Sequence, residues 1–98
     1  MKLSEKQRKH LRGLGHALKP VVYVADAGLS PSVLHEFRTA LAFHELIKVS
    51  VRVGEREART AIVDQLAADA GAVVVQRVGN TVLLYRRNPK KNRITLPN

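Results

Sequence analysis

The chain has 98 residues, which is the length of one domain and leaves no room for a second hydrophobic core. It carries 17 lysines and arginines against 8 acidic residues, for a net charge of +9, and it contains no cysteine. Disulfides, thiolate catalysis and cysteine-ligated zinc are therefore excluded.

The charge is unevenly distributed along the chain. Residues 1–24 hold six basic groups and one acid, and residues 25–76 hold five basic groups and seven acids. Residues 77–98 hold six basic groups and no acid. A domain with excess positive charge at both ends repels itself, so we expect a polyanionic partner, with nucleic acid as the first candidate. The alternative is a solvated basic surface that only keeps the protein soluble. We expect no membrane partner and no signal peptide, because no long apolar run is present, and hence a cytoplasmic protein.

The first predicted helix begins directly after Ser4, which forms a capping box with Gln7. Pro20 should end it, since the residue before a proline is pushed toward extended geometry. Gly13 and Gly15 weaken a helix, and their presence indicates either close packing against a sheet or a helix that frays near His16. The residues expected to face the core recur at helical spacing: Leu11, Leu14 and Leu18.

An apolar run at residues 21–24 predicts a short buried strand. A second helix should follow at residues 31–44, capped by Ser30. The loop at residues 25–30 would then present backbone N–H groups at a helix start, a position suited to a phosphate. The residues of this helix expected in the core are Val33, Leu34, Phe37, Ala40 and Leu41.

Residues 46–53 alternate between apolar and polar side chains, which predicts a strand with one wet or ligand-facing side. A third helix is expected at residues 55–70, ended by Gly71. Its expected inward residues are Ala58, Ile62, Leu66 and either Ala67 or Val63.

Two further strands, at residues 73–78 and 81–86, should form an antiparallel hairpin across Gly79-Asn80. The resulting order α-β-α-β-α-β-β implies crossovers between the first three strands, and so a mixed sheet in an α+β two-layer sandwich. We expect residues 1–87 to form the domain and residues 88–98 a basic C-terminal tail.

Catalytic and metal-binding patterns are missing. His44-Glu45-Leu46-Ile47-Lys48 begins like a zinc-protease motif but has Lys48 where a second histidine is needed. Asp26 is expected to cap a turn rather than hold a metal. The histidines are scattered, with no nucleophile beside them: His10, His16, His35 and His44. We therefore expect no catalytic residue, metal, cofactor or small-molecule substrate.

Four aromatic side chains are too few for an open sheet that stacks several bases, so contacts should be mainly to phosphates. Phe37 is expected in the core, and Tyr23 and Tyr85 as half-buried strand residues.

Four ordered segments, and the closing residues 93–97, resemble the successive signatures of the CRM domain, known in its stand-alone bacterial form as the YhbY-like family. They are residues 11–22, Gly28-Leu29 with Val33, residues 44–49, and residues 79–86. The resemblance implies a four-stranded mixed sheet in the order 1-2-4-3, similar to the C-terminal domain of the third bacterial translation initiation factor. It also implies binding to RNA and association with precursors of the large ribosomal subunit.

The family has a Gly-x-x-Gly loop that is likened to the RNA clamp of KH domains. In this chain the loop is Ala25-Asp26-Ala27-Gly28, with alanine in place of the first glycine and an added acid that would repel a phosphate. We therefore expect the loop to contribute less to RNA binding and the basic helix to contribute more.

We thus predict a non-catalytic protein that binds structured RNA, with ribosomal RNA in precursor particles as its partner. The alternatives are an RNA-processing enzyme or its subunit, or a protein–protein adaptor in ribosome assembly. The expected RNA-binding residues are Lys6, Arg8, Lys9, Arg12, Lys19, Gly28 and Arg86.

Overall fold

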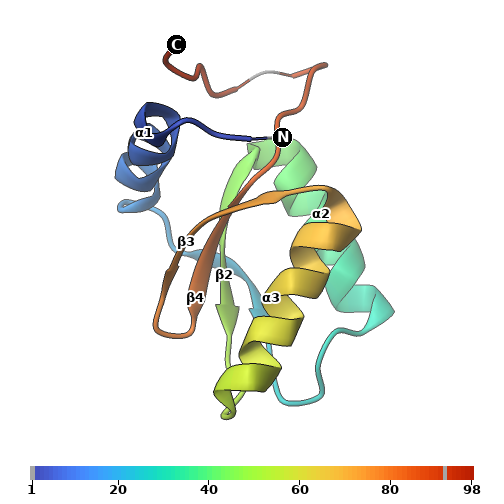
Figure 1. Ribbon diagram of the computed structural model, residues 1–98. Coiled ribbons are helices and arrows are strands. Elements are labelled where there is room, and N and C mark those ends of the chain that lie inside the picture. Colours follow the sequence, from blue (N-terminus) through green and yellow to red (C-terminus); the bar gives the residue numbers. More distant parts are fainter. Residues whose placement is uncertain (1, 92) are drawn as a thin grey trace.

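The computed structural model describes residues 2–91 and 93–98 (Figure 1). Met1 and Asn92, which belong to the expected domain and tail, lie outside the described residues. The elements follow the predicted order: α1 (Glu5–Gly15), β1 (Pro20–Val24), α2 (Pro31–His44), β2 (Leu46–Val51), α3 (Arg56–Ala70), β3 (Val73–Val78) and β4 (Thr81–Tyr85).

The four strands form one mixed sheet in the order β1-β2-β4-β3, which confirms the expected topology. β1 and β2 are parallel, whereas β4 is antiparallel to both of its neighbours. The β3–β4 hairpin turns at Gly79-Asn80, where Gly79 has a φ of 58°, a conformation that glycine adopts without strain.

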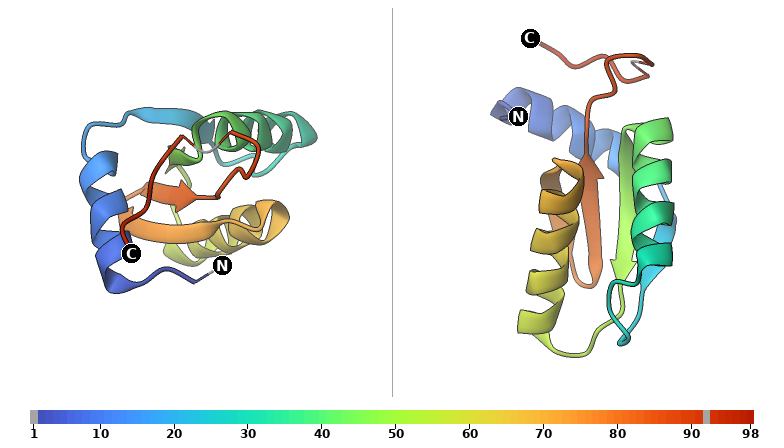
Figure 2. Two further views of the ribbon diagram at one scale, coloured as in Figure 1. Left: turned by 90° about the horizontal axis from the view of Figure 1, so that it is seen from above. Right: turned by 90° about the vertical axis from the view of Figure 1, so that its right-hand side faces the viewer.

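The helices lie on both faces of the sheet (Figure 2). α2 and α3 cover one face and form the expected two-layer core, in which Phe37 and Leu66 are fully buried against the alternate residues of the strands. α1 lies on the other face and closes a smaller second core. That core contains Leu3, Leu11, Leu46, Val75, Leu83 and Tyr85.

Local signals set the ends of the helices. Ser4 and Gln7 form the predicted capping box at α1, and the Ser30 hydroxyl accepts a hydrogen bond from the Val33 amide at 3.1 Å. Gly71 ends α3 in the left-handed conformation, as expected.

The leucine stripe predicted for α1 is wrong at two of its three positions. Leu11 is fully buried, but Leu14 is 42% exposed and Leu18 is 36% exposed. The helix ends at Gly15, well before Pro20, and so Leu18 is outside it. Since α1 is short and crosses only one end of the sheet, Leu11 and Leu3 are enough to fill the space beneath it.

The strand at residues 21–24 is buried on one side only, which corrects the expectation of a buried strand. Val22 and Val24 are in the core, but Val21 is 44% exposed and Tyr23 is 53% exposed, because no helix of the described chain covers that part of the sheet. On β2 the supposedly wet side is partly covered, since Ser50 is only 3% exposed.

The close approach of α1 to the sheet depends on Gly15. A methyl group added there would lie 2.5 Å from Cδ2 of Leu83, whereas one added at Gly13 meets nothing within 4 Å. We expect Gly15→Ala to lower the free energy of unfolding by about 1 kcal/mol or more, because Leu83 must move within a packed core. Gly13→Ala, the control, should raise it by about 0.5–1 kcal/mol through helix propensity. Chemical denaturation of both variants measures this, and equal stabilisation of the two would contradict the packing.

Candidate nucleic-acid interface

The outer side of α1 carries a row of cations. Lys6, Lys9 and Arg12 recur at a three-residue spacing, which places them along one side of the helix. Lys6 and Lys9 are exposed and Arg12 is half-buried. Within the described residues, none of the three forms an ion pair with an acid. Their charge is therefore available to an anionic partner.

Arg8, the fourth cation expected in this row, serves the fold. Its Nη1 donates hydrogen bonds to the carbonyl oxygens of Val74 at 2.9 Å and Val75 at 3.0 Å. The pairing of β3 with β4 shifts register between Val74 and Gln76, which makes Val75 the extra residue of a bulge. Arg8 thus satisfies carbonyls at a sheet edge and fastens α1 to β3, which leaves fewer donors for a phosphate.

Lys19 and Arg86 lie at the same end of the sheet. Lys19 immediately precedes β1 and Arg86 immediately follows β4, and both are exposed. Since β1 is parallel to β2 and β2 is antiparallel to β4, the first residue of β1 and the last residue of β4 lie at the same end of the sheet. This is the end of the sheet that α1 crosses (Figure 1).

The described residues after β4 form no helix or strand, but they are attached to the domain by the buried carboxylate of Glu45. Oε2 accepts a hydrogen bond from the amide of Asn88 at 2.6 Å, and Oε1 accepts from the amides of Arg93 at 2.6 Å and Ile94 at 2.9 Å. The carbonyl of Glu45 also accepts from the amide of Arg86 at 2.9 Å. Charge-assisted bonds of this kind are about twice as strong as neutral ones, so Glu45 organises the docked tail.

Further contacts extend the docking to α1. Gln7 Nε2 donates to the carbonyl of Pro97 at 3.1 Å, and Ile94 and Leu96 pack against the smaller core. The Arg93 guanidinium lies 4.2 Å from the ring centroid of Phe43 on α2. The tail therefore runs across the end of the molecule from α2 to α1 (Figure 2). We call this region, comprising the outer side of α1, Lys19, Arg86, Arg87, Lys90, Lys91 and Arg93, the basic end.

The Gly28 loop lies at the opposite end of the sheet, because it follows the finish of β1. Gly28 has a φ of 81°, and its amide donates to the Ala25 carbonyl at 2.9 Å to close a turn. Ser30 already occupies the Val33 amide at the start of α2. The structure thus does not bring Gly28 together with the cations of α1, and part of the loop's donor set is already used within the protein.

Ion pairing does little to neutralise the positive charge. Within residues 2–91 and 93–98, the ion pair present joins Arg38 on α2 and Asp69 on α3 at 2.7 Å, and neither residue belongs to the basic end. The hydrogen bond from Arg38 lowers the pKa of the Asp69 carboxyl, and the same contact raises the pKa of Arg38. Glu45 binds backbone amides instead of basic side chains.

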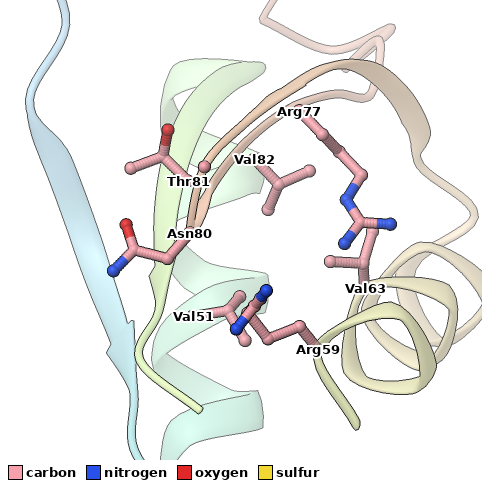
Figure 3. Close-up of a pocket in the computed structure, with 8 residues that line it drawn as sticks. Val51, Arg59, Val63, Arg77, Asn80, Thr81 and Val82 are labelled. Carbon is pink, nitrogen blue, oxygen red and sulfur yellow. The ribbon is translucent and has the colours of Figure 1, made fainter. Parts of the chain in front are cut away.

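Two arginines at the hairpin end also serve the fold. Figure 3 shows Arg59 and Arg77 pointing into the space between the hairpin and α3. Arg59 Nη1 donates to the carbonyls of Val53 at 2.8 Å and Gly54 at 3.0 Å, and Arg77 Nη1 donates to the Thr60 hydroxyl at 3.1 Å. The space between them has no accessible cavity volume, so it does not offer a ligand site.

No catalytic arrangement is apparent among the described residues. No three His, Asp or Glu side chains there gather closely enough to hold a metal ion. Burial raises the pKa of the Tyr85 phenol, and the nearby Glu45 charge adds to the effect, so this phenol stays neutral. None of the helices described is long and apolar enough to span a bilayer.

The sequence missed an exposed aromatic on the α1 side of the sheet. Tyr23 stands beside Arg52, whose guanidinium carbon is 5.2 Å from the ring centroid. No periodic signal marks Tyr23 as exposed, because all four residues from Val21 to Val24 are apolar or aromatic. The Tyr23 side of the strand is exposed only because no helix of the described chain covers it.

Comparison with known proteins shows a family match over most of the chain. The model of the CRS1 / YhbY (CRM) domain matches residues 3–86. A Pseudomonas aeruginosa protein named as a probable RNA-binding protein is 45% identical over 93 residues, which cover 95% of this chain and 89% of that one. A Haemophilus influenzae protein named as an RNA-binding protein is 41% identical over 95 residues, which cover 97% of this chain and 95% of that one.

The fold also matches a solved structure. The solution structure of a hypothetical protein from Staphylococcus aureus superimposes with a TM-score of 0.82 and 26% identity, over 98% of this chain and all of the other. The family model and the relatives each cover most of the chain, as the resemblance of its motifs implied. The chain belongs to the CRS1 / YhbY (CRM) domain family.

Proposed function

We propose that this chain is a non-catalytic RNA-binding protein whose basic end holds the phosphate backbone of structured RNA. The observation that carries the proposal is the gathering of cations from α1, Lys19 and the docked tail at one end, with no acidic partner among the described residues. Relatives over nearly the whole chain are named as RNA-binding proteins, which supports the same function.

The proposed target is ribosomal RNA in precursors of the large subunit, in the cytoplasm. The family resemblance supports this target. Phosphate contacts position a protein but carry little sequence information, so the shape of the folded RNA should select the site. Residues 1–87 would act as the binding domain, and the tail at residues 88–98 would add cations to its surface.

Crosslinking the protein to RNA in cells and sequencing the attached fragments tests the target. Enrichment of fragments from large-subunit ribosomal RNA and its precursors is expected. Fragments spread over messenger and transfer RNAs in proportion to their abundance would refute the proposed target.

Removing charge from α1 should weaken binding to most structured RNAs alike. In Lys9→Ala with Arg12→Ala, two phosphate partners are lost, and the slope of log K against log salt should become shallower by roughly two. Circular dichroism should show an intact fold, because neither side chain lies in the cores.

The matched control removes two positive charges from α2 and α3, as Arg38→Ala with Arg56→Ala. Both arginines are exposed, and the one surface ion pair lost contributes little to stability. The control should bind RNA nearly as the parent does. Equal losses in the two double variants would mean that net charge, and not the basic end, determines affinity.

A further inference from the structure

One half of the α1 side of the sheet is left open. α1 covers the end at which β4 finishes, while no helix of the described chain covers the end near the β3–β4 hairpin (Figure 1). Tyr23 is 53% exposed and Val78 is 61% exposed on this half. The cross-strand pairs Tyr23 with Ser50, and Thr81 with both Ser50 and Val78, place these side chains on one continuous surface. We call this surface the open sheet face.

A cavity of about 230 Å³ lies where the open sheet face meets the end of α1. Leu83 and Gly15 are among its lining residues, and Lys48, Gln76 and Thr81 add an ammonium, an amide and a hydroxyl group. The Thr81 hydroxyl donates to the Val78 carbonyl at 2.8 Å, so toward a ligand it acts as an acceptor.

The chemistry of this cavity fits a nucleobase better than a phosphate. A phosphate calls for several cations or free amides, whereas the polar lining here is one half-buried ammonium from Lys48, the imidazole of His16, and the neutral groups of Gln76 and Thr81. An apolar surface edged by a few placed donors and acceptors is typical of sites for flat heteroaromatic groups. The cavity is also smaller than the roughly 300 Å³ at which sites for drug-sized ligands begin, which favours a single base.

Tyr23 offers a second platform beside this cavity. Arg52 Nε donates to the Ser50 hydroxyl at 3.3 Å, which holds the guanidinium against one side of the ring. Tyr23 and Thr81 lie on strands that flank β2, so they are separated by two strand spacings, ~10 Å. Arginine beside an exposed aromatic ring is the combination that stacks bases in proteins that bind single strands.

We propose that the open sheet face binds unpaired nucleotides of the RNA that the basic end holds, with one base in the cavity and a neighbouring base stacked on Tyr23. Lys48 and Arg52 supply the positive charge that the connecting phosphates require. The strand would continue toward the Gly28 loop, which follows Tyr23 along the chain. This inference rests on the proposed function, and it specifies the RNA as a helix with an adjoining single-stranded segment.

The test compares two RNAs, a blunt duplex and the same duplex interrupted by a short run of unpaired uridines. The parent protein should bind the interrupted duplex more tightly. Tyr23→Leu and Gln76→Ala should each lose roughly 5- to 50-fold in affinity for the interrupted duplex and keep their affinity for the blunt one. Ultraviolet crosslinking to the uridines should attach RNA to the peptide containing Tyr23, a readout that altered folding alone does not produce.

His35→Leu is the matched control, because it removes an exposed ring from α2, on the other face of the sheet. It should bind both RNAs as the parent does. If the parent binds both RNAs and Tyr23→Leu binds them unchanged, with crosslinks elsewhere, the nucleotide site is overturned while RNA binding stands. If the parent binds neither RNA, the proposed function fails, and this inference fails with it.

Discussion

Replacing Phe37 with alanine is expected to lower the free energy of unfolding by about 3–5 kcal/mol. Phe37 is fully buried between α2 and the sheet, in the larger core, and removing its ring leaves a cavity among side chains from several strands. Small domains have only about 5–15 kcal/mol of stability in total, so this single change threatens folding. Denaturant titration followed by circular dichroism gives the difference directly.

Phe43→Ala provides the comparison on the same helix. Phe43 is 52% exposed and contacts His44 and Arg93, so the loss should be about 1 kcal/mol or less. Similar losses at the two positions would mean that α2 presents a different side to the sheet from the one described.

Replacing Glu45 with glutamine should release the C-terminal tail. The carboxylate accepts three backbone amides, from Asn88, Arg93 and Ile94, while glutamine keeps only one oxygen and turns an NH2 group toward donors. Because hydrogen bonds to a buried charged group are strong and the orphaned amides remain to be satisfied, we expect a loss of about 2–3 kcal/mol. Hydrogen exchange at the amides of Asn88 and Ile94 should accelerate strongly.

Glu36→Gln is the matched control, since Glu36 is exposed on α2. It should leave both stability and exchange at the tail amides unchanged. Protection of those amides that persisted in Glu45→Gln would show that the tail is docked by its apolar residues alone.

The parts of the fold that the sequence predicted are those with local causes. The capping box at Ser4, the cap at Ser30, the end of α3 at Gly71 and the hairpin at Gly79-Asn80 each depend on residues a few positions apart. The order of the strands depends on long-range pairing, and it was predicted only through the resemblance to a known family.

The parts that the sequence missed depend on distant segments. Glu45 looked like half of a failed zinc motif, because its partners lie more than 40 residues away at positions 88, 93 and 94. Leu14 looked like a core residue and is exposed, since α1 crosses only one end of the sheet. Arg8 was expected to bind phosphate, but it hydrogen-bonds carbonyls of β3 at a bulge that no local sequence pattern predicts.

The dependence of RNA affinity on salt shows directly whether the cations of the basic end bind phosphates. With about four to six such contacts, log K for a structured ribosomal RNA fragment should fall with log salt at a slope of roughly −3 to −5. Filter binding or fluorescence anisotropy over a range of potassium concentrations gives the slope. A slope near zero with measurable affinity would contradict phosphate binding by the basic end, because binding would then not depend on the cations at all.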